Sequence, residues 1–362
     1  MRLSRYLAGD VLGHTFAVSL VLLAIIITGR FVKYLADAAS GELAAEILLP
    51  VMLYRLPGFL ELLLPLGLFI GILMAYGRLY VESEMVILSA CGIGPGRLAR
   101  VTLVPATLIM LLVGSLALLL TPQGAARSEA LLNDPRAFQG INLLQEGRFQ
   151  SRGGSGVVSY AAAIDRDEGE LQRVFFYEPA EEGDEGAPSV TVAQRGRVVR
   201  DEETHVRYIE FEEGFRFNGA AGAGAFQITT FDTFGQRLPE DPSLSRAQPV
   251  DARPTMSLIG STALEDIAAF HWRLSLVAMV PIVALLALAL SKTNHRQGRY
   301  IKLAPALILH LSYLMLLASI RTRVAEGDGT IELFWLCHGV FLVLALLLLQ
   351  GPALRQRLRF SR

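Results

Sequence analysis

The 362-residue sequence contains only two cysteines, Cys91 and Cys337, and few charged side chains. Two cysteines so far apart in the chain exclude a scaffold built on disulfides. Charged residues make up 19% of the chain, whereas soluble domains carry about 25%, and 52% of the residues are hydrophobic. This composition excludes a disordered chain and disfavours a simple soluble enzyme.

The usual signatures of nucleotide, metal and nucleophilic chemistry are missing as well. The sequence contains no G-x-x-x-x-G-K-[ST] loop, and we interpret the glycine-rich stretch Gly92–Gly96, which Pro95 interrupts, as a turn. The six histidines lie in different segments and lack the spacing of metal ligands. His310 and His338 fall within apolar runs, where they serve either a function or hydrogen bonding between helices. We therefore expect no catalytic residue, no bound metal and no cofactor.

Long apolar runs are what the chain has in abundance. A membrane core about 30 Å thick is spanned by roughly 20 helical residues, so runs of this length predict membrane-spanning helices. The first run is too long for a secretion signal, and Arg30 and Lys33 separate it from the small-residue triplet Ala36–Ala38. Six runs qualify: Val11–Gly29, Ile47–Tyr76, Leu98–Thr121, Phe270–Leu290, Leu303–Ile320 and Ile331–Gln350.

Orientation follows from lysine and arginine in the short connecting segments, because loops rich in these residues stay in the cytoplasm. Thirteen such residues lie in the segments that share a side with the N-terminus, and four lie on the other side. We therefore expect both termini in the cytoplasm and the long segment 122–269 outside it.

That long segment predicts a β domain. Short runs of alternating or β-branched residues are separated by turn-forming stretches, a pattern typical of a sandwich or jelly roll. Residues 122–271 hold 24 acidic and 14 basic side chains and no lysine, which argues against nucleic-acid binding. The expected strands are Gly156–Tyr160, Leu171–Tyr177, Ser189–Val199, His205–Phe211, Phe215–Asn218 and Phe226–Phe231.

The predicted fold class is therefore an α-helical membrane protein with six transmembrane helices and an inserted external β-jelly-roll-like domain. Residues 1–121 form the first three membrane helices, and 122–269 form the β domain. Residues 270–362 form the last three membrane helices and a basic cytoplasmic tail.

Between the second and third runs, the segment Gly77–Ile93 predicts a short amphipathic helix on the cytoplasmic side. Arg78 and Glu82 are four residues apart, a spacing at which they form an ion pair on one helical face. Glu84 has no basic residue three or four positions away, so it lacks a local cation. Exposed apolar residues beside such a carboxylate are typical of a helix that docks on another subunit, although a solvated interfacial helix shows the same pattern.

The stretch from Arg78 to Glu84, followed by Ala90-Cys91-Gly92, resembles the coupling helix of the LptF/LptG permeases, the membrane subunits of a bacterial lipopolysaccharide exporter. The resemblance covers the whole chain: six helices, an external β domain between the third and fourth, and a basic loop between the fourth and fifth. That loop, Asn294–Arg299, resembles the LptF branch more than the LptG branch.

The resemblance implies a non-catalytic permease subunit of an ABC-type exporter in the inner membrane, with its large domain in the periplasm. It would extract lipopolysaccharide and pass it to a periplasmic bridge. The implied partners are an LptB ATPase dimer in the cytoplasm, LptG, LptC and the LptA bridge. The alternatives are an LptG-type subunit, a membrane-anchored envelope enzyme and an envelope structural protein.

The resemblance also assigns roles to individual residues. Glu84, with Glu82 and Arg78, would dock the ATPase. Four cations would bind lipopolysaccharide phosphates near the lipid gate, or else merely anchor helix ends at the membrane surface: Arg30, Lys33, Arg321 and Arg323. The β domain would receive acyl chains between its sheets against inward-facing residues, or use these as ordinary core: Val174, Phe176, Val190, Val192, Phe215, Phe217, Phe226 and Ile228.

Overall fold

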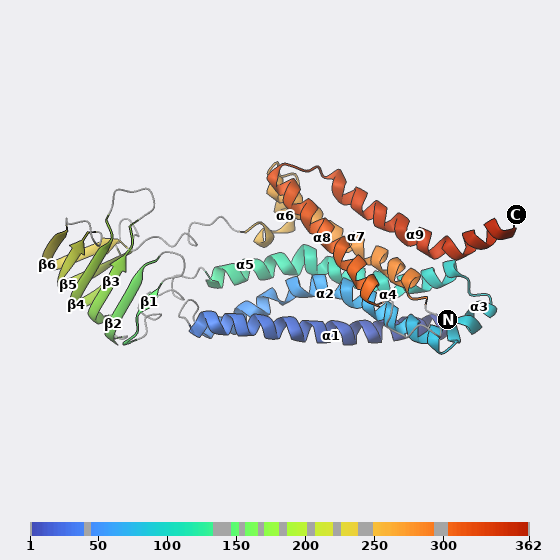
Figure 1. Ribbon diagram of the computed structural model, residues 1–362, viewed down its shortest axis with the longest axis horizontal. Coiled ribbons are helices and arrows are strands. Elements are labelled where there is room, and N and C mark those ends of the chain that lie inside the picture. Colours follow the sequence, from blue (N-terminus) through green and yellow to red (C-terminus); the bar gives the residue numbers. More distant parts are fainter. Residues whose placement is uncertain are drawn as a thin grey trace. The chain divides into compact units, whose positions relative to one another are not determined.

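The computed structural model describes residues 2–39, 45–132, 146–151, 156–165, 170–180, 187–200, 207–219, 226–237, 249–292 and 303–360. These residues divide into two compact units (Figure 1). A helical unit is formed within 1–29, 52–128 and 248–362, and a unit containing the β-sheet within 30–51 and 129–247. The basic loop Asn294–Arg299 lies outside the described residues.

The described part of the chain contains six helices that are long and apolar enough to cross a membrane, which confirms the six predicted runs. They belong to α1 (Arg2–Ala39), α2 (Ala45–Val81), α4 (Pro95–Ser115) with its continuation, α7 (Leu264–Leu290), α8 (Leu303–Glu326) and α9 (Glu332–Phe360). Three short elements connect them: α3 (Glu84–Ala90), the 3₁₀ turn η2 (Val250–Ala252) and α6 (Thr255–Leu258).

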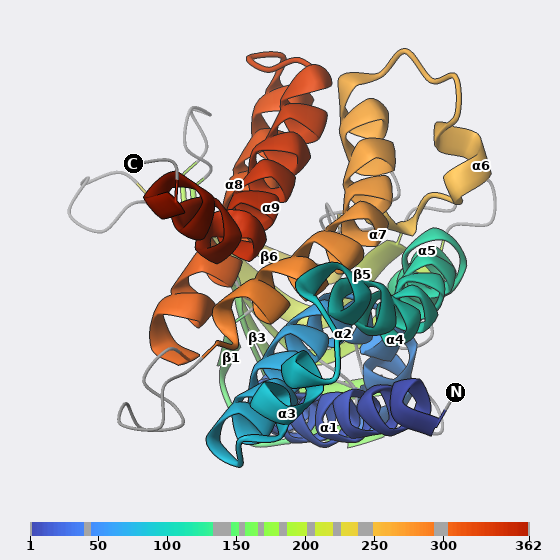
Figure 2. The same ribbon diagram turned by 90° about the vertical axis from the view of Figure 1, so that its right-hand side faces the viewer.

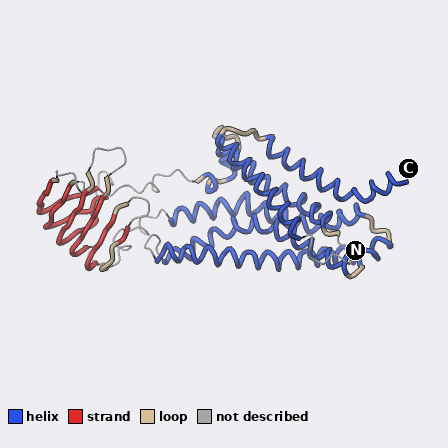
Figure 3. Tube along the Cα trace, in the orientation of Figure 1, coloured by secondary structure: helices blue, strands red, loops and turns tan. Residues whose placement is uncertain are grey.

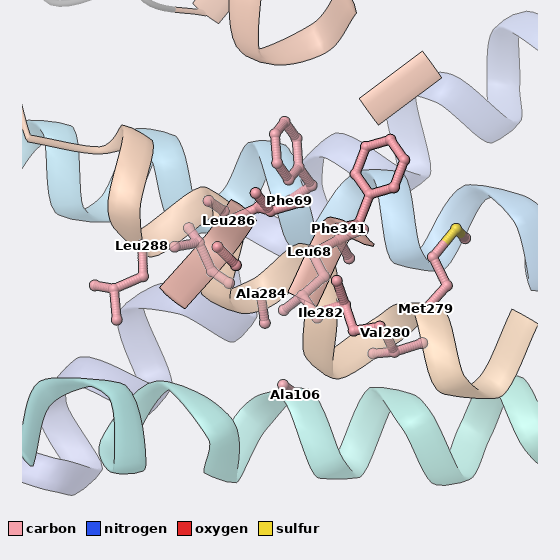
Figure 4. Close-up of a cluster of buried hydrophobic side chains, with 14 of the residues drawn as sticks. Leu68, Phe69, Ala106, Met279, Val280, Ile282, Ala284, Leu286, Leu288 and Phe341 are labelled. Carbon is pink, nitrogen blue, oxygen red and sulfur yellow. The ribbon is translucent and has the colours of Figure 1, made fainter. Parts of the chain in front are cut away.

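Helix α7 is the centre of the helical unit. It packs against α4 on one side and against α8 and α9 on the other (Figure 2). Met279, Val280 and Ala284 of α7 are completely buried in a core that also holds Phe69 of α2 and Phe341 of α9 (Figure 4). The outward faces of the surrounding helices are apolar as well, a property typical of helices that face lipid.

Helices α1 and α2 approach each other closely through small residues. Gly67 and Gly71 of α2 are four residues apart and face Thr15 and Ser19 of α1, which are also four apart. A Cβ atom at Gly71 would lie 2.7 Å from the backbone nitrogen of Thr15. Small residues at this spacing let two membrane helices pack backbone to backbone.

The third membrane helix is longer than predicted. The sequence placed its end at Thr121, but α4 continues through a π-helical turn, η1 (Leu116–Leu120), into α5 (Thr121–Leu132). Pro122 lacks the N–H that would bond the Leu118 carbonyl, and that carbonyl instead accepts a 2.5 Å hydrogen bond from Thr255 Oγ1. A side chain from another segment thus compensates for the proline, and the helix continues without ending.

The β unit contains a sheet in which neighbouring strands are antiparallel and follow chain order (Figure 3). The prediction of an inserted β domain is confirmed, and the described strands form a single sheet rather than the two of a sandwich. Its strands are β1 (Gln150–Ser151), β2 (Val158–Asp165), β3 (Glu170–Glu178), β4 (Ser189–Arg200), β5 (Arg207–Asn218) and β6 (Gln227–Arg237).

Two residues, Arg173 in β3 and Glu213 in β5, form a crease at which the regular alternation of side chains between the two faces of the sheet is interrupted. Arg173 and Glu213 have φ of 49° and 54°, and the register omits the pairs that these residues would make. In β5, Phe211 before the crease is buried, whereas Phe215 and Phe217 after it are 39% and 37% exposed. The left-handed residue interrupts the alternation of β5, so the buried positions change from odd-numbered to even-numbered residues while the same face of the sheet stays buried.

The expected set of inward-facing residues is therefore only partly right. Val174 and Phe176 belong to the buried core of the sheet. Phe226 and Ile228 are 74% and 53% exposed, and Ile228 pairs with Phe217 across β5 and β6. The prediction was wrong for these positions because neither left-handed residue is a glycine, so the sequence showed no break in the alternation.

Candidate functional site

The segment predicted to dock another subunit is a corner between two helices (Figure 1). Helix α2 runs on to Val81, Ser83 takes a left-handed φ of 62°, and α3 begins at Glu84. After α3, Gly92 has a φ of 83°, which glycine adopts without steric strain, and Pro95 opens α4. The single helix expected over Gly77–Ile93 is thus corrected to the last turn of α2 followed by a separate α3.

Polar contacts fix this corner to the beginning of α1. Arg78 Nη1 donates to Glu82 Oε2 at 3.0 Å, which confirms the predicted ion pair. Arg78 Nη2 also reaches Asp10 Oδ2 at 3.2 Å. The Tyr6 hydroxyl donates to Glu84 Oε2 at 3.3 Å. The structure therefore brings together all three residues that the sequence singled out in this segment, and α1 supplies two partners that sequence spacing did not indicate.

Helix α3 turns apolar side chains outward. Val86 and Ile87 are each 61% exposed, whereas Met85 between them and Glu84 is buried in the core of the helical unit. Glu84, Val86 and Ile87 together are called the α3 surface below. The buried Met85 holds the helix in place, so this surface has a defined position relative to α1 and α2.

The four predicted cations fall in two pairs. Arg30 and Lys33 are exposed and three residues apart in α1, a spacing that places them on one helical face. Arg321 and Arg323 lie in the last turns of α8, and Arg323 is exposed. The two pairs belong to different compact units, so their convergence on one gate stays a prediction.

Arg321 has an anionic partner in the structure. Its Nη2 donates a hydrogen bond to Oδ1 of Asp251 in η2. Its guanidinium also lies over the ring of Trp272, 5.5 Å from the ring centroid. Asp251 was missed by sequence reasoning, because 70 residues separate it from Arg321 and only the fold brings them together.

Arg273 of α7 organises the segment that holds Asp251. Its side chain is buried, and its Nη2 donates to the carbonyl oxygens of Asp251 at 3.2 Å and Arg253 at 2.9 Å. Its Nη1 donates to Thr255 Oγ1 at 2.7 Å, the same hydroxyl that bonds the Leu118 carbonyl. An arginine within an apolar run is costly unless its donors are satisfied, which was the signal that the sequence offered for this residue.

Glu61 of α2 is a second buried charge in the same region. Thr121 Oγ1 donates to Glu61 Oε2 at 2.6 Å, and the charges of Asp251, Arg273 and Arg321 all act on this carboxylate. The network thus reaches α2, the start of α5, η2, α7 and α8.

His310 of α8 and His338 of α9 are both buried in the helical unit. The His310 ring lies 5.0 Å from that of Phe69, and His338 Nδ1 makes a 2.5 Å hydrogen bond with the Tyr313 hydroxyl, from α9 to α8. The residues that the structure describes contain no group of three His, Cys, Asp or Glu arranged to hold a metal ion.

Among the residues that the structure describes, the architecture combines six membrane-length helices, an inserted sheet and a helical corner between the second and third membrane helices. The family described as "Lipopolysaccharide export system permease LptF/LptG" matches residues 5–351. The chain belongs to the LptF/LptG family. Within it, the permease is similar to proteins named lipopolysaccharide export system permease protein LptF.

Two of these relatives come from Escherichia coli K12 and Shigella flexneri. Each is 27% identical to the permease over 367 residues, which cover 100% of this chain and 99% of the relative. The full-length match to proteins named LptF favours this branch over LptG and over an envelope structural protein. The chain is thus a multi-span permease subunit of a lipopolysaccharide export system, and such a system operates from the inner membrane.

Proposed function

We propose that the chain is the LptF-type subunit of the exporter and that a separate cytoplasmic ATPase moves it through the α3 surface. The observation that carries this proposal is the 61% exposure of both Val86 and Ile87 beside the Glu84 carboxylate. Two apolar anchors and one acidic group fit a groove that offers apolar contacts and an arginine or lysine. An LptB dimer is the proposed motor.

The contacts of α3 suggest how motion would pass into the membrane. Tyr6 and Asp10 of α1 hold Glu84 and Arg78, and α1 packs tightly on α2 through Gly67 and Gly71. A displacement of α3 therefore acts on α1 and α2 together. The membrane helices respond as packed bodies, because close-packed interiors transmit strain.

An external energy source is required by the chemistry of the substrate. Transfer of an acyl chain out of the bilayer costs about 0.8 kcal/mol per methylene, so each chain costs several kcal/mol. Spontaneous extraction of a lipid with several chains is negligible. We propose that the apolar helices form a cavity with LptG that receives these chains, and that ATP-driven closure expels the lipid.

The phosphates of the headgroup need cations at the rim of this cavity. Arg30, Lys33, Arg321 and Arg323 are the proposed set, placed on the periplasmic side with the β domain, while both termini and α3 are cytoplasmic. LptC would contribute a helix beside the gate, and the β domain would hand the lipid to the LptA bridge.

Copurification tests the docking role of the α3 surface. The full chain is coexpressed with LptG and the ATPase, and the ATPase retained in mild detergent is quantified. Ile87→Ala and Glu84→Ala are each expected to reduce the retained ATPase several-fold, because residues central to an interface contribute about 1–2 kcal/mol or more. Leu111→Ala is the matched control, since Leu111 is 67% exposed on α4 and lies outside the α3 surface. Wild-type retention by both α3 variants would refute the docking role.

A further inference from the structure

The guanidinium of Arg321 has an anionic partner within the chain itself, the side chain of Asp251. The Asp251 carboxylate accepts a hydrogen bond from Arg321 Nη2. The Asp251 side chain is 59% exposed and that of Arg321 is 29% exposed, so the pair is reachable from outside. A ligand phosphate that binds this guanidinium must therefore share it with the carboxylate or displace it.

Asp251 is held at this position by its backbone. Arg273 donates to the carbonyl oxygens of Val250, Asp251 and Arg253, on both sides of the Asp251 side chain. The Arg253 side chain is in turn fixed by Asp266, with Nη1 2.5 Å from Oδ1. The carboxylate therefore sits on an ordered segment, and little conformational entropy is lost when it pairs with Arg321.

Burial and hydrogen bonding make Arg321 better suited than Arg273 to bind a ligand. Arg273 is 5% exposed and its guanidinium donates to three carbonyl oxygens and to Thr255 Oγ1. Releasing it would break several part-buried hydrogen bonds at once. When a ligand binds Arg321, it displaces one exposed carboxylate, and the contact of Arg321 with Trp272 is kept.

We propose that Asp251 is a specificity-determining residue that competes with lipid headgroups for Arg321. A phosphate monoester carries a charge of about −1.5 to −2 and three acceptor oxygens, so it replaces a single carboxylate favourably. A phosphodiester headgroup carries a single negative charge and gains little over Asp251. Asp251 thus raises the intrinsic affinity that an anionic headgroup needs in order to occupy Arg321, a threshold that a phosphate monoester passes and a phosphodiester does not at the same concentration. This inference rests on the proposed lipid-binding role of Arg321.

Binding of two lipids to the full chain in phosphatidylcholine nanodiscs tests the proposal. The probes are fluorescent bisphosphorylated lipid A and fluorescent phosphatidylglycerol. Asp251→Asn removes the charge and keeps the shape of the side chain, and it is expected to tighten binding of phosphatidylglycerol about two- to fivefold, the range of an exposed ion pair. Lipid A displaces the same carboxylate and is expected to tighten by the same factor, so the gain in occupancy at a fixed subsaturating concentration is seen for both lipids. Asp251→Glu keeps the charge and should retain the wild-type affinity for each lipid.

A double mutant identifies the group through which Asp251 acts. Arg321→Gln is expected to weaken lipid A binding, and Asp251→Asn in that background should have no further effect. If the pair of Asp251 with Arg321 only stabilises the fold, Asp251→Asn should have the opposite effect on binding. It would then weaken binding of both lipids and lower the melting temperature of the chain. Weaker or unchanged binding in Asp251→Asn overturns the competition while Arg321 keeps its role.

Two further outcomes separate the inference from the proposed function. If Arg321→Gln binds lipid A as the wild type does, Arg321 is not a lipid-binding group and both ideas fail together. If millimolar inorganic phosphate displaces lipid A completely, the site takes free phosphate and the lipid specificity assigned to Asp251 is wrong. Persistence of lipid A binding under phosphate supports a headgroup anchored by its acyl chains.

Discussion

A single methyl group at Gly71 is expected to separate α1 from α2. The Cβ atom of alanine would lie 2.6 Å from Thr15 Oγ1 and 2.7 Å from the Thr15 backbone nitrogen. Ordinary van der Waals contact begins at about 3.4 Å, so the helices must move apart by roughly 0.7 Å. Because the Thr15 nitrogen and the Thr15 Cα, which would lie 2.9 Å away, both belong to the backbone, a change of rotamer does not relieve the clash.

The magnitude follows from measured costs of overpacking. Extra methylenes in a packed core cost about 1–3 kcal/mol. At about 2–4 °C per kcal/mol for large domains, a cost near 2 kcal/mol lowers the apparent melting temperature by roughly 4–8 °C. The substitution should also weaken the contacts of Tyr6 and Asp10 at the corner between α2 and α3, because these contacts depend on where α1 lies on α2.

Thermal unfolding of the purified full chain in detergent measures the effect. Gly77→Ala is the matched control, because Gly77 lies in the same helix and a Cβ there meets nothing within 4 Å. That variant should melt at or slightly above the wild-type temperature, since alanine favours helix by roughly 0.5–1 kcal/mol over glycine. Equal melting temperatures for Gly71→Ala and wild type would show that α1 and α2 do not meet at these residues.

Two further predictions concern buried side chains. Arg273→Leu removes the donor of several part-buried hydrogen bonds and is expected to cost about 1.5–3 kcal/mol in thermal unfolding. Arg323→Leu, at an exposed position, should change stability little, and equal effects of the two variants would contradict the network. In the sheet, Phe211→Ala should cost about 3–5 kcal/mol and make the β unit of the full chain sensitive to protease, because Phe211 is fully buried. Phe226→Ala is its control at 74% exposure, and similar protease resistance of the two variants would show that the core of the sheet lies on the other face.

The helices were predictable because their signal is local. An apolar run of membrane length identifies a span without any knowledge of its neighbours. The predicted and observed ends of the helices differ mainly where polar residues continue the helix beyond the apolar run. The third span was predicted too short because Pro122 looks like a terminus. Its freed carbonyl is satisfied by Thr255, which lies far away in the chain.

The sites were predictable only where both partners lie within one or two helical turns. The pairing of Arg78 with Glu82 follows from a four-residue spacing. The pairs of Arg321 with Asp251 and of Glu84 with Tyr6 join segments about 70 residues apart or more, so no periodicity indicates them. The break at Ser83 was missed for a different reason, since a left-handed serine leaves no sign in the pattern of apolar residues.

We propose that this subunit is moved through α3 by a separate ATPase rather than by hydrolysing ATP itself. The most direct measurement is release of lipopolysaccharide from proteoliposomes that contain the full chain with LptG, compared with and without the ATPase and ATP. We expect no release without the ATPase and ATP-dependent release with it. That release should be lost in Ile87→Ala but not in Leu111→Ala. ATP hydrolysis by the purified chain alone, or undiminished release by the Ile87→Ala complex, would contradict this proposal.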